Sequence, residues 1–257
     1  MCELFGFTGS EKHNIADMLQ TLRDHSGLHP NGWGLALLDP ARTAVFHESI
    51  RAKDSRLLGG LLAAGVSADL AIAHIRLATI GSVTEDNCHP FVREDVSGRI
   101  WTLAHNGTIF DFPDLQRFYD IDGCETDSAC VLAWLTEQIN QQTEENNGPL
   151  SQLQLNQVIS DAIAELAPHN KLNLLFSDGA HLYVHTNMVG TLFMKKIGSG
   201  MAFATVPLDY GGWVPVPMNK LHIFKKGEHL WSGSAHHGTY VKDDAQTHRV
   251  IHNYVVF

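Results

Sequence analysis

The chain begins with the stretch Cys2-Glu3-Leu4-Phe5-Gly6-Phe7, in which apolar residues alternate behind an N-terminal thiol. This alternation predicts a strand over Glu3–Thr8. A small residue after Met1 is the context in which the initiator is removed, and its removal leaves a thiol and a free α-amine on Cys2. The α-amine titrates at about pH 8, so it can act as the base for its own thiol. Cys2 is therefore a candidate nucleophile; the alternative is a small buried hydrophobe at the start of a strand.

The composition narrows the classes of function. The 257 residues are 44% hydrophobic and 18% charged, as in an ordinary soluble globular protein. The net charge of -10 and the scattered basic residues argue against nucleic acid as a partner. No secretory signal and no apolar run of about 18 residues is present, so we expect no membrane partner. Four cysteines without a CxxC pair predict free thiols in a reducing cytoplasm.

The sixteen histidines do not indicate a metal site. The chain has no HExxH motif, and the adjacent pair His236-His237 lacks a third ligand nearby in sequence. We therefore expect no metal and no organic cofactor.

Strands come first along the chain, two long helices follow, and strands then resume. Helical periodicity is found from about Ile15 to Arg23, from Asp127 to about Gln141, and from about Ser151 to Leu166. The polar stretch Gln141–Gly148 is expected to be a loop, too short for a domain linker, which favours one domain over residues 1–257. This order predicts an α+β fold in which helices cover the outer faces of β-sheets, but it does not define the number of layers. The remaining strands are expected at Gly34–Leu38, Ala44–His47, Leu70–Arg76, Ile100–His105, Leu172–Phe176, His181–His185, Met201–Ala204, Leu221–Lys225, Thr239–Val241 and Val250–Tyr254.

Three polar positions could serve a reaction at Cys2. Arg76 ends an apolar strand, where it can meet a carboxylate; the alternative is a structural ion pair. Asn106-Gly107 is a turn signal, but its side-chain amide and unobstructed backbone N–H also suit an oxyanion hole. Asp127 starts a helix, where it can cap the helix, bind a substrate ammonium group, or do both.

The order of the sequence motifs that surround these residues is specific for one protein family. After the N-terminal Cys come NGWG (31–34), HIRLATIG (74–81), NCHPF (87–91), HNG (105–107) and ETDS (125–128). Together they resemble the class II glutamine amidotransferase domain of the N-terminal-nucleophile (Ntn) superfamily. That family includes the glutaminase parts of glucosamine-6-phosphate synthase, asparagine synthetase and the first enzyme of purine synthesis. NLLFSDG (173–179) and ATVPLDYGGWVPVP (204–217) look like the small stand-alone members, the YafJ type.

The resemblance implies a four-layer αββα sandwich of two mainly antiparallel sheets. It also implies that Cys2 attacks the γ-amide of glutamine, its α-amine shuttles the proton through a water, and Asn106 and Gly107 stabilise the oxyanion. Ammonia then leaves, and water hydrolyses the γ-glutamyl thioester. Arg76 and Asp127 would hold the α-carboxylate and α-amine of the substrate.

The resemblance places four more residues at the site, as pocket-wall or supporting groups around the substrate. They are Thr79, His89, Trp33 and His105.

Two positions depart from the larger synthases, which often carry Trp directly after the Arg and His before the Gly of HxRxATxG. Here those residues are Leu77 and Ile80, which leaves free glutamine and another γ-glutamyl compound open as substrates. With free glutamine, a synthase on a separate chain would accept the ammonia; a γ-glutamyl hydrolase needs no acceptor. A catalytically silent binding or regulatory homologue is the alternative from another class. The sequence leaves the oligomeric state open, a homodimer included.

Overall fold

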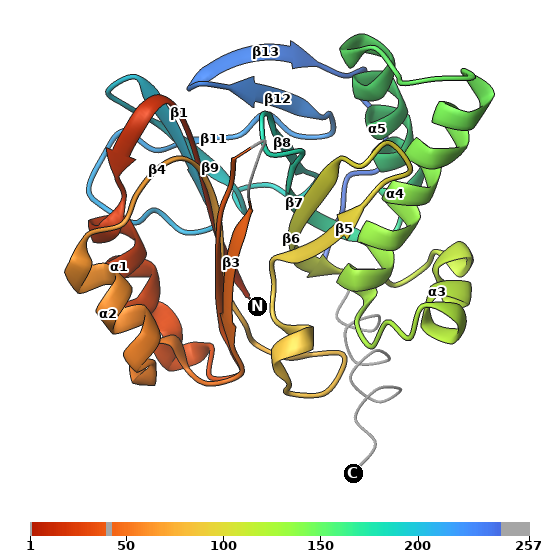
Figure 1. Cartoon of the computed structure of the whole chain (residues 1–257). Coiled ribbons are helices and arrows are strands. Elements are labelled where there is room, and N and C mark those ends of the chain that lie inside the picture. The colour runs from red at the N-terminus through yellow and green to blue at the C-terminus, as the bar shows by residue number, and fades with distance from the viewer. Residues whose placement is uncertain (1, 40–42, 243–257) are drawn as a thin grey trace.

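The computed structural model describes residues 2–39 and 43–242, which form four layers (Figure 1). Two antiparallel sheets pack face to face, and helices cover the outer face of each sheet. The α+β fold expected from the residues and the αββα sandwich implied by the resemblance are both confirmed. Met1 and the strand expected at Val250–Tyr254 lie outside the described residues.

The first sheet has seven strands in the order β11-β9-β10-β1-β4-β2-β3. The N-terminal strand β1 is central, with Phe5 opposite Ala73 on one side and Ala204 on the other. Because side chains alternate along a strand, Phe5 points toward the helices and Leu4 toward the second sheet. The strands are β1 (Glu3–Asn14), β2 (Trp33–Leu37), β3 (Ala44–Glu48), β4 (Ser67–Ile75), β9 (Phe193–Ile197), β10 (Gly200–Ala204) and β11 (Val214–Pro215).

The second sheet has six strands in the order β13-β12-β8-β7-β6-β5. β6 pairs with the whole of β7, from Thr102 opposite Ser177 to Thr108 opposite Lys171. This pairing brings the Asn106-Gly107 segment beside the start of β7. The strands are β5 (Phe91–Glu94), β6 (Ile100–Thr108), β7 (Lys171–Ser177), β8 (Leu182–Thr186), β12 (His222–Lys225) and β13 (Glu228–Ser232).

The helices that cover the sheets begin at clear sequence signals. In the layer on the second sheet, Thr126 accepts from the Ala129 N–H, and Ser151 forms a reciprocal capping box with Gln154. The helices are α1 (Ala16–Asp24) and α2 (Arg56–Ala64) on the first sheet, with α4 (Asp127–Glu145) and α5 (Gln152–Leu166) on the second; the short α3 (Gln116–Ile121) packs beside α4.

Two local expectations were wrong, and helices α2 and α3 and strands β5, β9, β11 and β13 were not expected. Helix α2 was not expected because Gly59 and Gly60 lower its helical propensity, yet Ser55 caps it and Leu58 is buried against the first sheet. Helix α4 continues to Glu145 through the stretch expected to be a loop, since glutamine and glutamate are good helix formers on an exposed face. Thr239–Val241 forms no strand.

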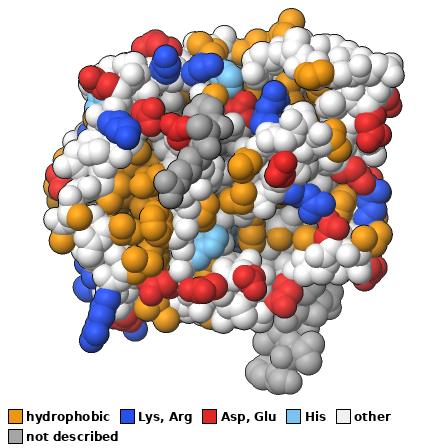
Figure 2. Space-filling model, in the orientation of Figure 1, with side chains coloured by type: hydrophobic (Ala, Val, Ile, Leu, Met, Phe, Trp, Pro, Cys, Tyr) orange, Lys and Arg blue, Asp and Glu red, His pale blue; other side chains and the backbone are white. Residues whose placement is uncertain are grey.

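None of the helices formed by the described residues combines the length and apolar character that a bilayer span requires. Basic side chains are dispersed over the face shown in Figure 2, while acidic side chains form a row along its lower edge. This face offers no continuous basic stripe for a nucleic acid backbone.

Candidate active site

Cys2 lies at the start of the central strand β1, where the end of β4 and the second sheet both reach it. The Leu77 N–H donates to Cys2 Sγ at 3.3 Å, and Sγ lies 3.4 Å from the Leu77 carbonyl oxygen. From the second sheet, the Asn106 side-chain amide donates to the Cys2 carbonyl oxygen. Burial raises the pKa of the thiol, while the Leu77 hydrogen bond and the nearby Arg76 charge act in the opposite direction.

Arg76 is buried, with 3% of its surface exposed, and it organises the loop that follows β4. Its guanidinium donates to the carbonyl oxygens of Ser82 at 2.8 Å and Ile80 at 3.1 Å. These contacts fix the path of the loop that carries Leu77 past the thiol. A guanidinium has five N–H donors, so the loop does not exhaust its capacity to bind a carboxylate.

Asn106 and Gly107 lie in β6. Side chains alternate along this strand: Leu103 points toward the helices and Ala104 toward the first sheet, so Asn106, two residues after Ala104, also points toward the first sheet. Gly107 has no room for a side chain, since a Cβ there would overlap the Lys171 carbonyl oxygen and His105 Nε2. The glycine is therefore required by the close approach of β7.

Asp127 occupies the first turn of α4, and Thr126 provides the cap. Its carboxylate accepts from the Ile109 N–H at 3.0 Å and from the Ser128 N–H at 2.8 Å. Its negative charge acts to raise the pKa of Cys2. Like Arg76, Asp127 combines a structural role with a position beside the nucleophile.

His105 points toward α4 and does not touch the thiol. Its Nδ1 lies 3.0 Å from Ser128 Oγ and its Nε2 lies 3.0 Å from the Lys171 carbonyl oxygen. Burial lowers its pKa, which favours the neutral ring. His105 therefore joins β6, β7 and the start of α4.

Thr79, His89 and Trp33 occupy three different environments. Thr79 is exposed in the loop after Arg76, where it can meet a substrate. His89 is buried against His74, with ring centroids 4.2 Å apart and the rings tilted by 41°. Neither ring has a hydrogen-bond partner among the described residues. Trp33 packs toward α1 and α2 and donates to Glu48, so it lies on the opposite face of the first sheet from Asn106.

Lys171 is a site residue that the sequence analysis missed. It is buried, with 5% exposed, and its Nζ lies 3.4 Å from Asn106 Oδ1. Burial lowers its pKa to about 8, and the proximity of Cys2 opposes that shift. The available signal was a lysine opening the apolar strand KLNLLFS, whose two faces are both covered in this class of fold.

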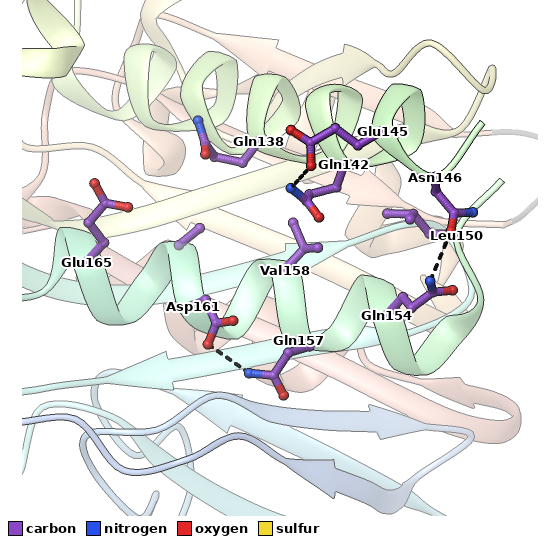
Figure 3. Close-up of a pocket in the computed structure, with 11 residues that line it drawn as sticks. Gln138, Gln142, Glu145, Asn146, Leu150, Gln154, Gln157, Val158, Asp161 and Glu165 are labelled. Carbon is purple, nitrogen blue, oxygen red and sulfur yellow. Dashed lines mark hydrogen bonds between the residues drawn. The ribbon is translucent and has the colours of Figure 1, made fainter. Parts of the chain in front are cut away.

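A hollow lies away from Cys2, between helices α4 and α5 (Figure 3). It has a volume of about 550 Å³ and is lined mainly by amides and carboxylates. Many of these side chains bind one another, as in the Gln142–Glu145 and Gln157–Asp161 pairs. Neither Cys2 nor any residue placed near it lines this hollow. Within residues 2–39 and 43–242, no group of three or more metal-ligating side chains is arranged around a common point.

A cysteine at the head of the central strand of an αββα sandwich, with an amide from the facing sheet bonded to its backbone carbonyl oxygen, is consistent with the Ntn amidotransferase class of protein. Residues 1–197 match the family described as class II glutamine amidotransferases. The chain therefore belongs to this family.

The chain is also similar to individual proteins of several organisms. Protein MJ1515 of Methanocaldococcus jannaschii is 30% identical over 90% of this chain and 71% of its own length. YafJ of Escherichia coli, named as a glutamine amidotransferase by prediction, is 28% identical over 81% of this chain and 87% of its own length.

Among solved structures, glutamine phosphoribosylpyrophosphate amidotransferase from B. subtilis aligns with a TM-score of 0.66 and 17% identity over 90% of this chain. At that identity the likeness concerns the fold alone. The chain spans 49% of the length of that enzyme.

Proposed function

We propose that this protein hydrolyses the γ-amide of glutamine, or of a γ-glutamyl compound, with Cys2 as the nucleophile. The observation that carries the proposal is the convergence on Cys2 of the Leu77 N–H from β4 and the Asn106 amide from β6. A thiol that is only a structural hydrophobe does not need the Leu77 hydrogen bond, and the Asn106 contact with the Cys2 backbone carbonyl oxygen brings an amide donor next to the thiol.

The reaction begins once Met1 has been removed. The α-amine of Cys2 takes the thiol proton through a water, and the thiolate attacks the γ-carbonyl carbon. The Asn106 amide and the Gly107 N–H stabilise the oxyanion, and the protonated amine passes its proton to the departing nitrogen. Ammonia leaves for free glutamine, and an amine leaves for another γ-glutamyl compound. Water then cleaves the thioester to give glutamate and restore the thiol.

Two opposite charges would recognise the amino-acid head group of the substrate. Arg76 would bind the α-carboxylate with donors that the loop does not use, and Asp127 would bind the α-ammonium group. The influence of both side chains on the pKa of Cys2 supports this arrangement. His105 and His89 would act only by holding the surrounding strands, and Thr79 would contact the substrate from the loop.

The exposure of the loop after Arg76 supports a γ-glutamyl compound as the second candidate substrate. Leu77 is half-exposed beside the thiol and Thr79 is exposed, so the loop after Arg76 is accessible. Leu77 and Ile80 replace the Trp and His that larger synthases often carry there. Release of ammonia to a separate synthase is the expected use of free glutamine, and a γ-glutamyl hydrolase would need no such partner.

The test compares glutamine with γ-glutamyl peptides in a glutamate-release assay, alongside covalent labelling by diazo-oxo-norleucine. We expect turnover of at least one substrate and labelling of Cys2, with both lost in Cys2→Ala. Absence of turnover and labelling in protein shown by mass to lack Met1 would favour a silent homologue and overturn the proposal.

A further inference from the structure

Among the lysines of the described residues, only Lys171 is buried. It begins β7, the strand that pairs with the Asn106-Gly107 segment of β6. Burying an ammonium group is unfavourable unless nearby groups stabilise its charge. A buried lysine beside a nucleophile therefore calls for a functional explanation.

The backbone on both sides of Lys171 is rigidly held. Asn170 Oδ1 accepts from the backbone N–H groups of Phe110 and Asp111 at 2.6 and 2.9 Å. Asn187 Oδ1 accepts from the Leu172 N–H at 2.9 Å, and its side-chain nitrogen donates to the Asn170 carbonyl oxygen at 2.8 Å. These contacts fix where the lysine side chain leaves β7.

The side chain then reaches the amide that faces Cys2. Leu172 and Leu174 point toward the helices, so Lys171 lies on the alternate face, toward the first sheet. Nζ is 3.4 Å from Asn106 Oδ1, and Asn106 Nδ2 donates to the Cys2 carbonyl oxygen. An ammonium can only donate, so the amide oxygen turns toward Lys171 and the amide nitrogen toward Cys2.

We propose that Lys171 is a positioning residue of the oxyanion site: its ammonium group holds the Asn106 amide with Nδ2 directed at the reaction centre and adds a positive charge behind the developing oxyanion. The inference deepens the proposed function and rests on it. Lys171 acts through Asn106 and has no direct contact with the reacting carbonyl.

The charge of the Lys171 side chain depends on pH. Since burial lowers the pKa of Lys171 to about 8, the ammonium form prevails below that pH and is lost above it. Other titratable or charged groups in this region are Cys2, which acts on Lys171, His105, on which Lys171 acts, and Arg76 and Asp127, which act on Cys2; His74 faces the second sheet from β4 and is held neutral by burial. Of these, His105 is held neutral by burial, and Arg76 and Asp127 bring opposite charges.

The principal test is Lys171→Met, which keeps the length of the side chain and removes its charge. We expect kcat to fall about 10- to 100-fold with KM changed by less than about threefold, because the defect lies in oxyanion stabilisation. We expect the activity of the unaltered protein to fall above about pH 8 and this fall to be absent from the variant. In an Asn106→Ala background, Lys171→Met should have little further effect on kcat. Unchanged kcat, or additive effects of the two substitutions, would overturn the proposal.

A second readout does not require turnover. Mass spectrometry of peptides can follow the rate at which iodoacetamide alkylates Cys2 at about pH 7, where Lys171 carries its charge. Loss of that charge in Lys171→Met makes the Cys2 thiolate less favourable and should slow the alkylation by about threefold or more. The alkylation rate of Cys124, measured in the same sample, should not change. An unchanged Cys2 rate would exclude a charge effect of Lys171, even if the protein hydrolyses neither glutamine nor a γ-glutamyl peptide.

The matched control is Lys225→Met. Lys225 lies in β12 of the same sheet and contacts His181 at 3.3 Å, away from Asn106. We expect its kcat and its rate of Cys2 alkylation to match those of the unaltered protein. If Lys171→Met does not fold, Lys171→Gln retains a hydrogen-bond donor. Its Cys2 alkylation at about pH 7 should still be slowed, and a folded Lys171→Gln protein with an unchanged rate would refute the inference.

Discussion

The backbone N–H of Leu77 donates to Cys2 Sγ at 3.3 Å, so the thiol is tied to the residue that directly follows the buried Arg76. The Arg76 guanidinium in turn binds the carbonyl oxygens of Ile80 and Ser82. The environment of the nucleophile therefore depends on an arginine that shapes the loop beside it.

Arg76→Lys should lower both stability and activity. A lysine cannot reproduce the planar set of donors, and buried carbonyl oxygens would lose their partners. We expect the free energy of unfolding to fall by about 3 kcal/mol, measured by urea denaturation, and glutamate release to fall with it. Arg51→Lys is the control, because its ion pair with Asp54 is exposed and should contribute less than about 1 kcal/mol. Lost activity with unchanged stability would mean that Arg76 serves the substrate alone.

Gly107→Ala should disrupt the pairing of β6 with β7. The new Cβ would overlap the Lys171 carbonyl oxygen, which belongs to the backbone and cannot simply rotate away. We expect a loss of about 3 kcal/mol or more in the free energy of unfolding, together with loss of turnover. Gly60→Ala is the control, since no atom lies within 4 Å of a Cβ at that exposed position of α2. It should raise stability by about 0.5 to 1 kcal/mol; equal effects of the two substitutions would contradict the close approach of β7 to Gly107.

Stability should decrease on acidification because of the buried pair His74 and His89. Burial lowers the pKa of both rings well below the usual value of about 6.5, so the folded state binds fewer protons than the unfolded state. Full stability is therefore present above about pH 6.5 and is lost as the pH falls toward the lowered values. Each histidine contributes a slope of up to about 1.4 kcal/mol per pH unit in that window. Denaturation curves at several pH values should show a smaller slope for His89→Leu, and an identical slope would contradict this prediction.

Activity should require removal of Met1. While Met1 remains attached, the nitrogen of Cys2 is an amide and cannot accept the thiol proton. Protein that carries an extra N-terminal segment should be inactive, and proteolytic exposure of Cys2 should restore turnover. Intact mass gives the state of the terminus in each sample. Full activity with Met1 in place would contradict the proposed role of the α-amine.

Much of the fold was predictable because its signals are local. The alternation in Glu3–Thr8 and the apolar periodicity after Asp127 identified β1 and α4, and the Ser151 signal marked the start of α5. Helix α2 was missed because the local cost of Gly59 and Gly60 is offset by burial of Leu58, which depends on the sheet beneath it.

The sequence by itself determined the candidate nucleophile, since the position of Cys2 after Met1 and the order of the Arg76, Asn106-Gly107 and Asp127 segments are properties of the chain. The tertiary structure alone decided which of the predicted residues meet. It brought the Asn106 amide to Cys2 and directed Trp33 to the opposite face of the first sheet. It also placed Lys171 behind Asn106, 65 positions away in sequence. The physical reason is that side-chain alternation assigns a residue to a face, whereas the pairing and packing of distant strands determine what that face contacts.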